Sequence, residues 1–435
     1  MNFGSTVLNM QKHVVLTTRQ FYATISSISV ISFLVSLWIN RTTWFISDDF
    51  AFLTYRYFEF VDGDKLHAIL TPHNDHLMAL PILIFVSLQY FFGLNNHLIF
   101  MVPSIIINIA IMFAVAIILR KRCKSDLSSF AAVCCVAFMS RGCEVLMMAT
   151  NIGFITTICI ALFQLILVDH DGATSKRDYV ASLFGVVAIL CSGASIPLLA
   201  MVVLFLILKH EIKRSILIAG PAAVLYMLWF FGFGTLTSSA AGPLQYPPFT
   251  MKVQTFQFVI DGLRESLSAI THVGGSSTFL IIICFLGLNK KNTKLSTILM
   301  PICLAIGGVA FFFITAYSRV TFGNATSGRY IYVGAVLFVP LIFIGIEQLF
   351  ESISTYQVFA IVACVWLSIT GIFGFLSATE TSPYTDPVRI QTLFAARDLV
   401  VNGSAPVSGT PSPTYDPDLT YEWIRRLVNN DMWNK

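Results

Sequence analysis

Charged residues are scarce in this chain of 435 residues. Asp, Glu, Lys and Arg make up 11% of it and hydrophobic residues 56%, whereas a soluble domain carries about 25% charged residues. A chain this apolar cannot cover itself with a polar surface, so lipid must solvate much of it. The scarcity of charge therefore excludes an ordinary soluble protein and predicts an all-α integral membrane fold.

Motifs of several other protein classes are also absent. None of the nine cysteines stands in a C-x-x-C pair, so the sequence predicts neither a structural zinc site nor a redox pair. The spacing from Gly323 to Gly328 lacks the strand–turn–helix context of a nucleotide-binding loop. The predicted inner loops are too short for a cytosolic nucleotide-binding domain, and nothing predicts a nucleic-acid partner. An enzyme of this kind would need a lipid-borne or periplasmic donor.

About eleven apolar runs approach the ~20 residues that a helix needs to cross a bilayer. They cover residues 22–40, 98–119, 126–140, 151–168, 178–191, 194–208, 215–233, 276–288, 296–314, 330–346 and 357–376. The first run ends at Asn40, Arg41 and Thr42 without a small-residue cleavage site. We therefore expect a retained first span rather than a signal peptide.

Lys and Arg concentrate in alternate connections between these runs, as they do in cytoplasmic loops. Clusters such as Arg120, Lys121 and Arg122 fit an N-terminus in the cytoplasm, and only the inner loop 347–356 lacks both residue types. The apolar segment 77–93 would invert this pattern if it crossed the membrane. We therefore predict that it lies flat on the outer surface, where its aromatic residues suit the interface.

This topology divides the chain into a transmembrane domain, residues 1–376, and a periplasmic tail, residues 377–435. The outer segments are the first loop (41–97), residues about 234–275 and about 315–330, and the tail. Six prolines predict that the first half of the tail is irregular. The pattern of residues 421–428 predicts a short amphipathic helix near its end.

An acidic pair, Asp48 and Asp49, follows the first span. Two adjacent carboxylates repel each other, which makes one of them a candidate proton acceptor or a ligand for a divalent metal. The alternative is structural, because the pair could cap a helix that begins at Phe50. The same loop also contains a second polar cluster, and this coincidence favours a functional site.

The second cluster consists of His73, Asp75 and His76, directly before the predicted interfacial segment. Histidine titrates near neutral pH and binds metals, so this stretch offers further bases or ligands. Together the two clusters make the first outer loop, residues 41–97, the predicted catalytic loop.

Three further regions carry polar side chains. Glu144 lies where the third run leaves the membrane, and it either has a function or pairs with Arg141 three residues earlier. Arg319, Arg329 and Tyr330 fall on the predicted outer side, against the cytoplasmic preference of arginine. A fork of donors for a lipid phosphate would explain these arginines. The alternative is that Arg329 and Tyr330 only anchor the next span at the headgroups.

The layout resembles the GT-C superfamily of membrane glycosyltransferases, which use polyprenyl-phosphate sugars. The resemblance rests on the acidic pair after the first span, the stretch 73–76, the interfacial segment 77–93 with the span that follows it, and the turn Gly328-Arg329-Tyr330. Within that superfamily the size and tail are most similar to the phage-type serotype-converting O-antigen glucosyltransferases. Those proteins transfer glucose from undecaprenyl-phosphate-glucose to O-antigen repeats of lipopolysaccharide in the periplasm.

The resemblance implies transfer of a hexose, expected to be glucose, with inversion at the anomeric carbon. It implies that Asp48 or Asp49 acts as the general base. It also implies that Arg329, with Arg319 or His76, stabilises the charge left on the polyprenyl phosphate. Further residues expected to bind substrate or lipid phosphate are His73, Asp75, Glu144 and Tyr330.

The same resemblance implies a multi-pass protein of the bacterial inner membrane, with its N-terminus in the cytoplasm and its C-terminus in the periplasm. The expected partners are the polyprenyl-phosphate sugar, an O-antigen or related polysaccharide, and membrane lipids. The acidic pair lacks the D-x-D spacing that some relatives use for metal, so the sequence leaves a divalent metal open and predicts no other cofactor.

Four alternatives fit parts of the sequence. An O-antigen polymerase or ligase would carry a large outer loop late in the chain, whereas the acidic motifs here come early. A transporter or flippase for polyprenyl-linked saccharides would place charges within its spans, and these spans carry few. An acyltransferase would need a His-Asp pair at an inner loop. A eukaryotic lumenal transferase would use the sequons at Asn40, Asn324 and Asn402.

Overall fold

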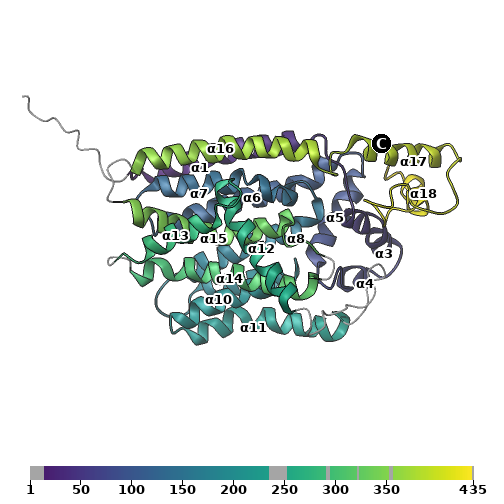
Figure 1. Cartoon of the computed structure of the whole chain (residues 1–435). Coiled ribbons are helices and arrows are strands. Elements are labelled where there is room, and N and C mark those ends of the chain that lie inside the picture. Colours follow the sequence, from purple (N-terminus) through teal and green to yellow (C-terminus); the bar gives the residue numbers. More distant parts are fainter. Residues whose placement is uncertain (1–13, 235–251, 291–293, 321–322, 352–355, 434–435) are drawn as a thin grey trace, which may run out of the picture.

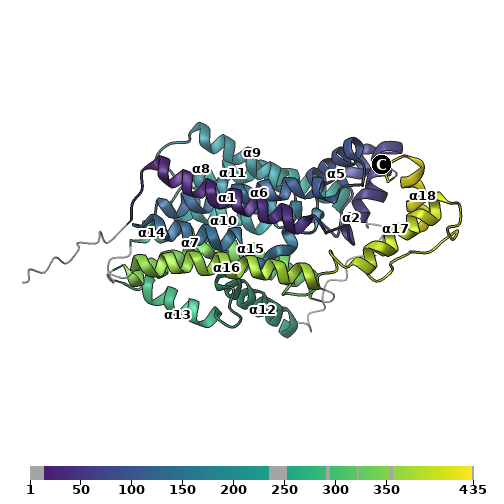
Figure 2. The ribbon, with the colours of Figure 1, turned by 90° about the horizontal axis from the view of Figure 1, so that it is seen from above.

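The computed structural model describes residues 14–234, 252–290, 294–320, 323–351 and 356–433. Within these ranges the regular structure is helical, and the one β-bridge joins His73 to His76. Long helices lie side by side along a common axis (Figures 1 and 2). The predicted all-α membrane fold is confirmed.

Twelve helices form this bundle. In chain order they are α1 (Thr18–Asn40), α6 (His97–Arg120), α7 (Asp126–Ala137), α8 (Ile152–Val168), α9 (Lys176–Ile189), α10 (Ser195–Leu208), α11 (Ile212–Trp229), α12 (Lys252–Thr271), α13 (Ser277–Leu288), α14 (Leu295–Arg319), α15 (Gly328–Phe350) and α16 (Tyr356–Thr381). Among the described residues, seven helical segments are long and apolar enough to cross a bilayer, or eight if α7 and the bent 3₁₀ segment η2 (Ser140–Leu146) form one span. The number eleven stays a prediction, because α10 and α13 are apolar but short.

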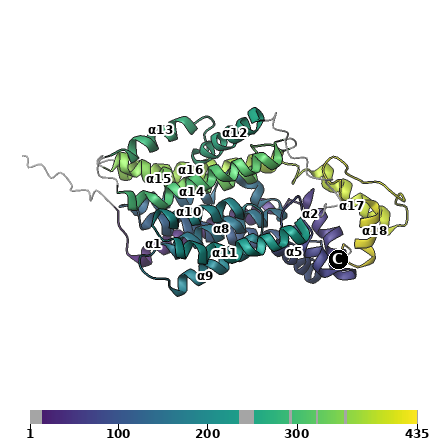
Figure 3. The same ribbon diagram turned by 90° about the horizontal axis from the view of Figure 1, so that it is seen from below.

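Residues 252–271 lie within the predicted outer segment 234–275. They form α12, which packs along α14 and α15, and α13 continues from it along the same side of the bundle (Figures 2 and 3). A Cβ atom added at Gly262 would lie 2.2 Å from Cε1 of Phe312, so α12 approaches α14 closely. Large and small side chains, among them Phe258, Gly262 and Ser266, form the buried face of α12, and its outer position stays a prediction. Residues 235–251 lie outside the described residues.

Burial separates the centre of the bundle from its surface. In α15, 78% of the membrane-length window is buried, compared with 22% in α16. The face of α16 that points away from the bundle exposes large apolar side chains such as Phe359, Trp366 and Phe373. An exposed apolar surface of this kind is unfavourable in water and fits a lipid environment.

Shorter elements gather at one end of the bundle, which we call the site end (Figures 1 and 3). They are α2 (Asp48–Ala51), the π-helical turn η1 (Phe52–Arg56), α3 (Tyr57–Asp62), α4 (Lys65–Leu70), α5 (Ala79–Phe92), α17 (Pro387–Val401) and α18 (Tyr421–Asn429). The C-terminus of α5 exposes Tyr90, Phe91 and Phe92, an exposure that fits an interfacial helix.

The tail packs against the first outer loop. The prediction that the first half of the tail is irregular is wrong, because residues Pro387–Val401 form α17. Proline is favourable in the first turn of a helix, and Asp386 caps this one by accepting a hydrogen bond from the Val388 amide at 2.9 Å. The predicted amphipathic helix near the end is confirmed as α18. The rings of Phe58 in α3 and Trp423 in α18 stack with their centroids 5.8 Å apart.

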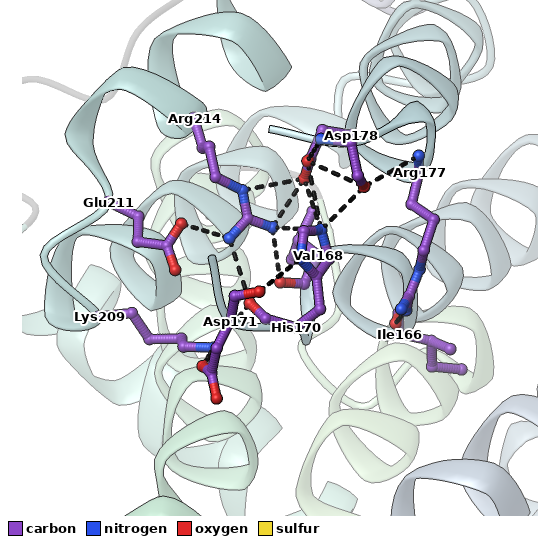
Figure 4. Close-up of polar contacts among 10 residues, drawn as sticks. Ile166, Val168, His170, Asp171, Arg177, Asp178, Lys209, Glu211 and Arg214 are labelled. Carbon is purple, nitrogen blue, oxygen red and sulfur yellow. Dashed lines mark hydrogen bonds and ion pairs between the residues drawn. The ribbon is translucent and has the colours of Figure 1, made fainter. Parts of the chain in front are cut away.

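Ion pairs join the loops at the opposite end, which carries the basic clusters. Arg214 of α11 is buried and donates to Oδ1 of Asp178 at 2.7 and 3.0 Å, and it also contacts Glu211 (Figure 4). Arg214 also donates to the carbonyl oxygen of Val168 at 3.0 Å. The buried guanidinium therefore has several partners and links the ends of α8, α9 and α11.

The inner loop that breaks the charge pattern, residues 347–356, supplies acids to this end. The backbone amide of Lys124 donates to Glu347 at 2.6 Å, and its side-chain ammonium donates to Glu351 at 2.5 Å. A connection without Lys or Arg thus pairs with the basic connection beside it. Residues 352–355 lie outside the described residues.

Candidate active site

The side chains of Asp48 and Asp49 diverge. Asp49 is fully buried: its Oδ1 accepts from the Thr150 amide at 2.9 Å and its Oδ2 from the Ile46 amide at 3.3 Å. Burial raises the pKa of Asp49 to about 7, although both backbone hydrogen bonds oppose this shift. Asp48 stays partly exposed and lines a cavity. The predicted capping role is wrong, because α2 already begins at Asp48, with Ser47 at the N-cap.

His73, Asn74, Asp75 and His76 form a tight turn. The backbone of His73 and His76 exchanges two hydrogen bonds of 3.0 Å. Asn74 and Asp75 between them have φ values of 48° and 67°, in the left-handed region that Asn and Asp tolerate better than most residues. The Asn-Asp pair therefore permits a turn that brings both histidines to the same cavity.

Both histidines are neutral at physiological pH. Burial, together with the nearby cations Arg319 and Arg329, lowers the pKa of His73 to about 4 and that of His76 to about 3, although Asp48 opposes the shift of His73. A neutral His76 can donate a hydrogen bond, so its expected role in stabilising the phosphate charge stays a prediction. Asp75 occupies the turn and is not among the residues that line the cavity. Burial raises its pKa, although Arg319 opposes this.

Arg329 lies between two acids. Its Nη1 is 4.0 Å from Oδ2 of Asp48, and its Nε is 3.6 Å from Oε1 of Glu144. Glu144 also accepts from the Ser327 hydroxyl at 2.8 Å and from the Arg329 amide at 3.3 Å. Glu144 thus holds both the guanidinium and the first turn of α15. A carboxylate at a helix N-terminus is favoured by the helix dipole.

The predicted alternative partner of Glu144 is wrong. Arg141 pairs with Glu265 of α12 rather than with Glu144, three residues away in η2. The close approach of η2 and α15 requires a glycine, since a Cβ atom at Gly328 would lie 2.9 Å from Cβ of Glu144. The 3₁₀ conformation of η2 and this contact therefore turn Glu144 toward α15.

Arg319 and Tyr330 complete this region from α14 and α15. The Nη2 of Arg319 donates to the Asn74 carbonyl at 2.9 Å, so the arginine also fixes the histidine turn. The buried ring of Tyr330 packs against Phe154 and Phe311, with centroids 6.1 Å apart in each case. Tyr330 is therefore a wall of the site as well as a predicted ligand.

A first cavity, of about 120 Å³, joins these groups. Arg319 and Arg329 line it together with Asp48, His73 and His76. The first turn of α15 also faces the cavity through Ser327 and Tyr330. Six of the nine predicted site residues thus line one space: Asp48, His73, His76, Arg319, Arg329 and Tyr330. Asp49, Asp75 and Glu144 lie behind it.

A second cavity, of about 320 Å³, adjoins the first. Asp48, His73 and Asn74 line both cavities. The other residues that line it include Tyr55 and Arg56 of η1 and, from the tail, Pro417, Asp418, Thr420 and Trp423. Asp48 therefore stands at the junction of a cavity lined by two arginines and a cavity lined by the tail.

Sequence reasoning missed Arg56, Asn74 and the tail residues. Arg56 donates to the carbonyl oxygens of Ala68 and Pro72 at 3.2 and 2.7 Å, and thus holds the backbone that leads into the histidine turn. Its presence in an outer loop, against the cytoplasmic preference of arginine, was a usable signal. No pattern in the sequence indicated which residues of the tail line the second cavity.

Several side chains of the site, among them Asp48, His73 and His76, carry atoms that can bind a metal ion. Among the described residues, no group of three or more His, Cys, Asp or Glu side chains converges in a way that could hold a metal ion. The acidic pair itself diverges, since Asp49 is turned toward Thr150 and Asp48 toward the cavities. Within the part of the chain that the structure describes, these donors therefore do not form a dedicated cation site.

No family model matches the chain, and no curated protein matches its sequence. Among solved structures, it resembles the crystal structure of ArnT from Cupriavidus metallidurans in the apo state, with a TM-score of 0.55 at 10% identity, over 90% of this chain and 82% of that one. A structure of ArnT from the same organism bound to undecaprenyl phosphate aligns with a TM-score of 0.46 at 12% identity, over 96% and 78%. The alignment with the apo structure shows that this chain shares the fold of ArnT.

Proposed function

We propose that this chain is a membrane glycosyltransferase that moves a hexose from a polyprenyl-phosphate donor to a saccharide acceptor. The observation that carries the proposal is the approach of Arg329 to Asp48, 4.0 Å apart on the wall of one cavity. A cation suited to phosphate and a carboxylate suited to a hydroxyl proton thus face the same space. The fold shared with ArnT and the resemblance of the sequence to the GT-C superfamily, whose members use such donors, support the proposal.

The phosphate of the donor would bind between Arg319 and Arg329. Guanidinium groups bind phosphate through parallel hydrogen bonds. Ser327 and the N-terminus of α15 face the same cavity and add a favourable dipole. Glu144 and Asp48 balance the two cations, so the charge of the cavity is moderate and the orientation of Arg329 is fixed.

The reaction itself needs one base and one stabilised leaving group. Asp48 takes the proton from a hydroxyl of the acceptor, and the hydroxyl oxygen forms a bond to the anomeric carbon. The bond from that carbon to the phosphate oxygen breaks, and the electron pair leaves with the polyprenyl phosphate. Arg329 and Arg319 offset the charge that develops there. Attack opposite the phosphate inverts the anomeric configuration.

Asp49 has a different role in this scheme. It is buried away from the cavity and joins the catalytic loop to the Thr150 backbone. Because Asp49 lines neither cavity, it is a weaker candidate for the base than Asp48. We propose that Asp49 positions the turn that carries Asp48.

The finer proposal follows the sequence resemblance. It names glucose as the hexose and lipopolysaccharide O-antigen as the acceptor, at the periplasmic face of a bacterial inner membrane. Reconstitution in lipid nanodiscs with a synthetic polyprenyl-phosphate glucose tests the donor. Linkage analysis of the surface polysaccharide from cells with and without the protein tests the acceptor. An identical polysaccharide in both cell types would overturn the finer proposal.

A further inference from the structure

We propose that the second cavity, between the first outer loop and the tail, binds the saccharide chain of the acceptor. The inference rests on the proposed function, because it assumes that Asp48 is the base. Asp48, His73 and Asn74 line both cavities, so a molecule in the second cavity reaches the same carboxylate as a donor in the first. The two substrates would meet at Asp48 from opposite sides.

The chemistry of the second cavity suits a sugar rather than a lipid chain. Its lining offers a carboxylate at Asp418 and a hydroxyl at Thr420, together with the aromatic rings of Tyr55 and Trp423. Sugars bind through hydrogen bonds from their hydroxyls to such groups and through contact of their apolar faces with aromatic rings. An acyl chain would leave these polar groups without partners.

The Trp423 ring of this cavity is held in place. It stacks on Phe58 of α3 with an interplanar angle of 12°. Arg426 lies over the Phe58 ring at 4.3 Å while its Nη2 donates to Asp62 at 2.6 Å, so these contacts join α18 to α3 beside the cavity. A preformed wall lowers the entropic cost of binding a flexible saccharide.

Charge distribution distinguishes the two cavities. The first is lined by Arg319 and Arg329, which suit the phosphate of the donor. The second is lined by two half-exposed acids, Asp48 and Asp418, while Arg56 at its wall is engaged by the carbonyl oxygens of Ala68 and Pro72. An anionic lipid would be repelled there, whereas a hydroxyl-rich chain would find acceptors.

Binding measurements on the full-length protein in nanodiscs test this assignment. The acceptor probe is the surface polysaccharide released by mild acid from cells that lack the protein, and the donor probe is a polyprenyl monophosphate. Asp418→Asn and Trp423→Leu should each weaken polysaccharide binding and raise its KM about tenfold, the loss of one polar or stacking contact. Affinity for the polyprenyl phosphate should not change.

A matched control separates cavity effects from effects on the tail. Asp398→Asn changes an exposed acid of α17 outside the cavity lining and should leave both affinities unchanged. Normal polysaccharide affinity in both cavity variants would overturn the inference. So would a raised KM for the intact polyprenyl-phosphate hexose alone, which would assign the cavity to the sugar of the donor. Failure of the proposed function is distinct, since the unaltered protein would then bind no polyprenyl phosphate and transfer no sugar.

Discussion

Arg389 of α17 and Asp416 form a fully buried ion pair that reaches the predicted catalytic loop. The Nε and Nη2 atoms of Arg389 donate to the two oxygens of Asp416 at 2.9 Å. Oδ1 of Asp416 also accepts from the amide of Ser47 at 3.2 Å, and Arg389 donates to the carbonyl of Phe45. The tail thus holds the backbone directly before Asp48. Ser47 and Asp416, which form this contact, lie 369 residues apart in the chain.

Asp416→Asn tests this contact. Breaking a buried pair leaves an unpaired charge, at a cost of about 3–5 kcal/mol. We expect a lower thermal unfolding midpoint and a reduced turnover with little change in donor affinity. Asp398→Asn, which breaks an exposed pair with Arg397, should cost at most about 1 kcal/mol. Equal behaviour of the two variants would argue against a positioning role for Asp416.

Asp48→Asn should abolish transfer. General-base catalysis contributes roughly 10²–10⁴-fold, so turnover should fall by at least about a hundredfold. The substitution keeps the size of the side chain, so membrane insertion and polyprenyl phosphate binding should persist. Radiolabelled sugar transfer in nanodiscs measures the loss. Retention of normal turnover would remove Asp48 from the role of base.

Asp49→Asn should act mainly through stability and pH. The pKa of Asp49 is raised from 3.8 to about 7 by burial, so between these values the folded protein holds a proton that the unfolded chain releases. The stabilising contribution of the neutral acid is complete below about pH 4 and declines as the pH rises toward 7, by about 1.4 kcal/mol per unit. The variant should lack this decline. Unfolding midpoints of both proteins from pH 4 to 8 provide the comparison, and parallel curves would contradict the assignment.

Arg329→Ala and Arg329→Lys should differ. Loss of the charged hydrogen bonds should weaken use of the donor by about 10–100-fold. Lysine restores the charge but not the planar fork, so it should recover only part of the activity. Donor KM and turnover measured for both variants decide this, and full rescue by lysine would show that charge alone suffices.

Gly193→Ala should disturb the histidine turn. A Cβ atom there would lie 2.5 Å from Nδ1 of His76, so the ring must move. We expect reduced transfer with normal insertion in the membrane. Gly220→Ala is the matched control, because nothing lies within 4 Å of a Cβ atom at that position. If both variants transfer sugar equally, the packing of His76 does not matter for activity.

Long-range contacts account for most of what sequence reasoning missed. The local alternative pairs Glu144 with Arg141, but the fold pairs these residues with Arg329 and Glu265 instead. In each pair the partner lies more than a hundred residues away in the chain, so no local pattern could identify it.

The sequence by itself determined the class of fold and the set of polar residues available for chemistry. Scarcity of charge requires lipid, apolar runs of nearly the ~20 residues that cross a bilayer select helices, and the arrangement of Arg and Lys predicts their orientation, because these are local consequences of solvation. Only the tertiary structure decided which acid faces the cavities. Asp48 and Asp49 are neighbours with the same chemistry, and their environments differ only because Thr150, Arg329 and the tail pack around them.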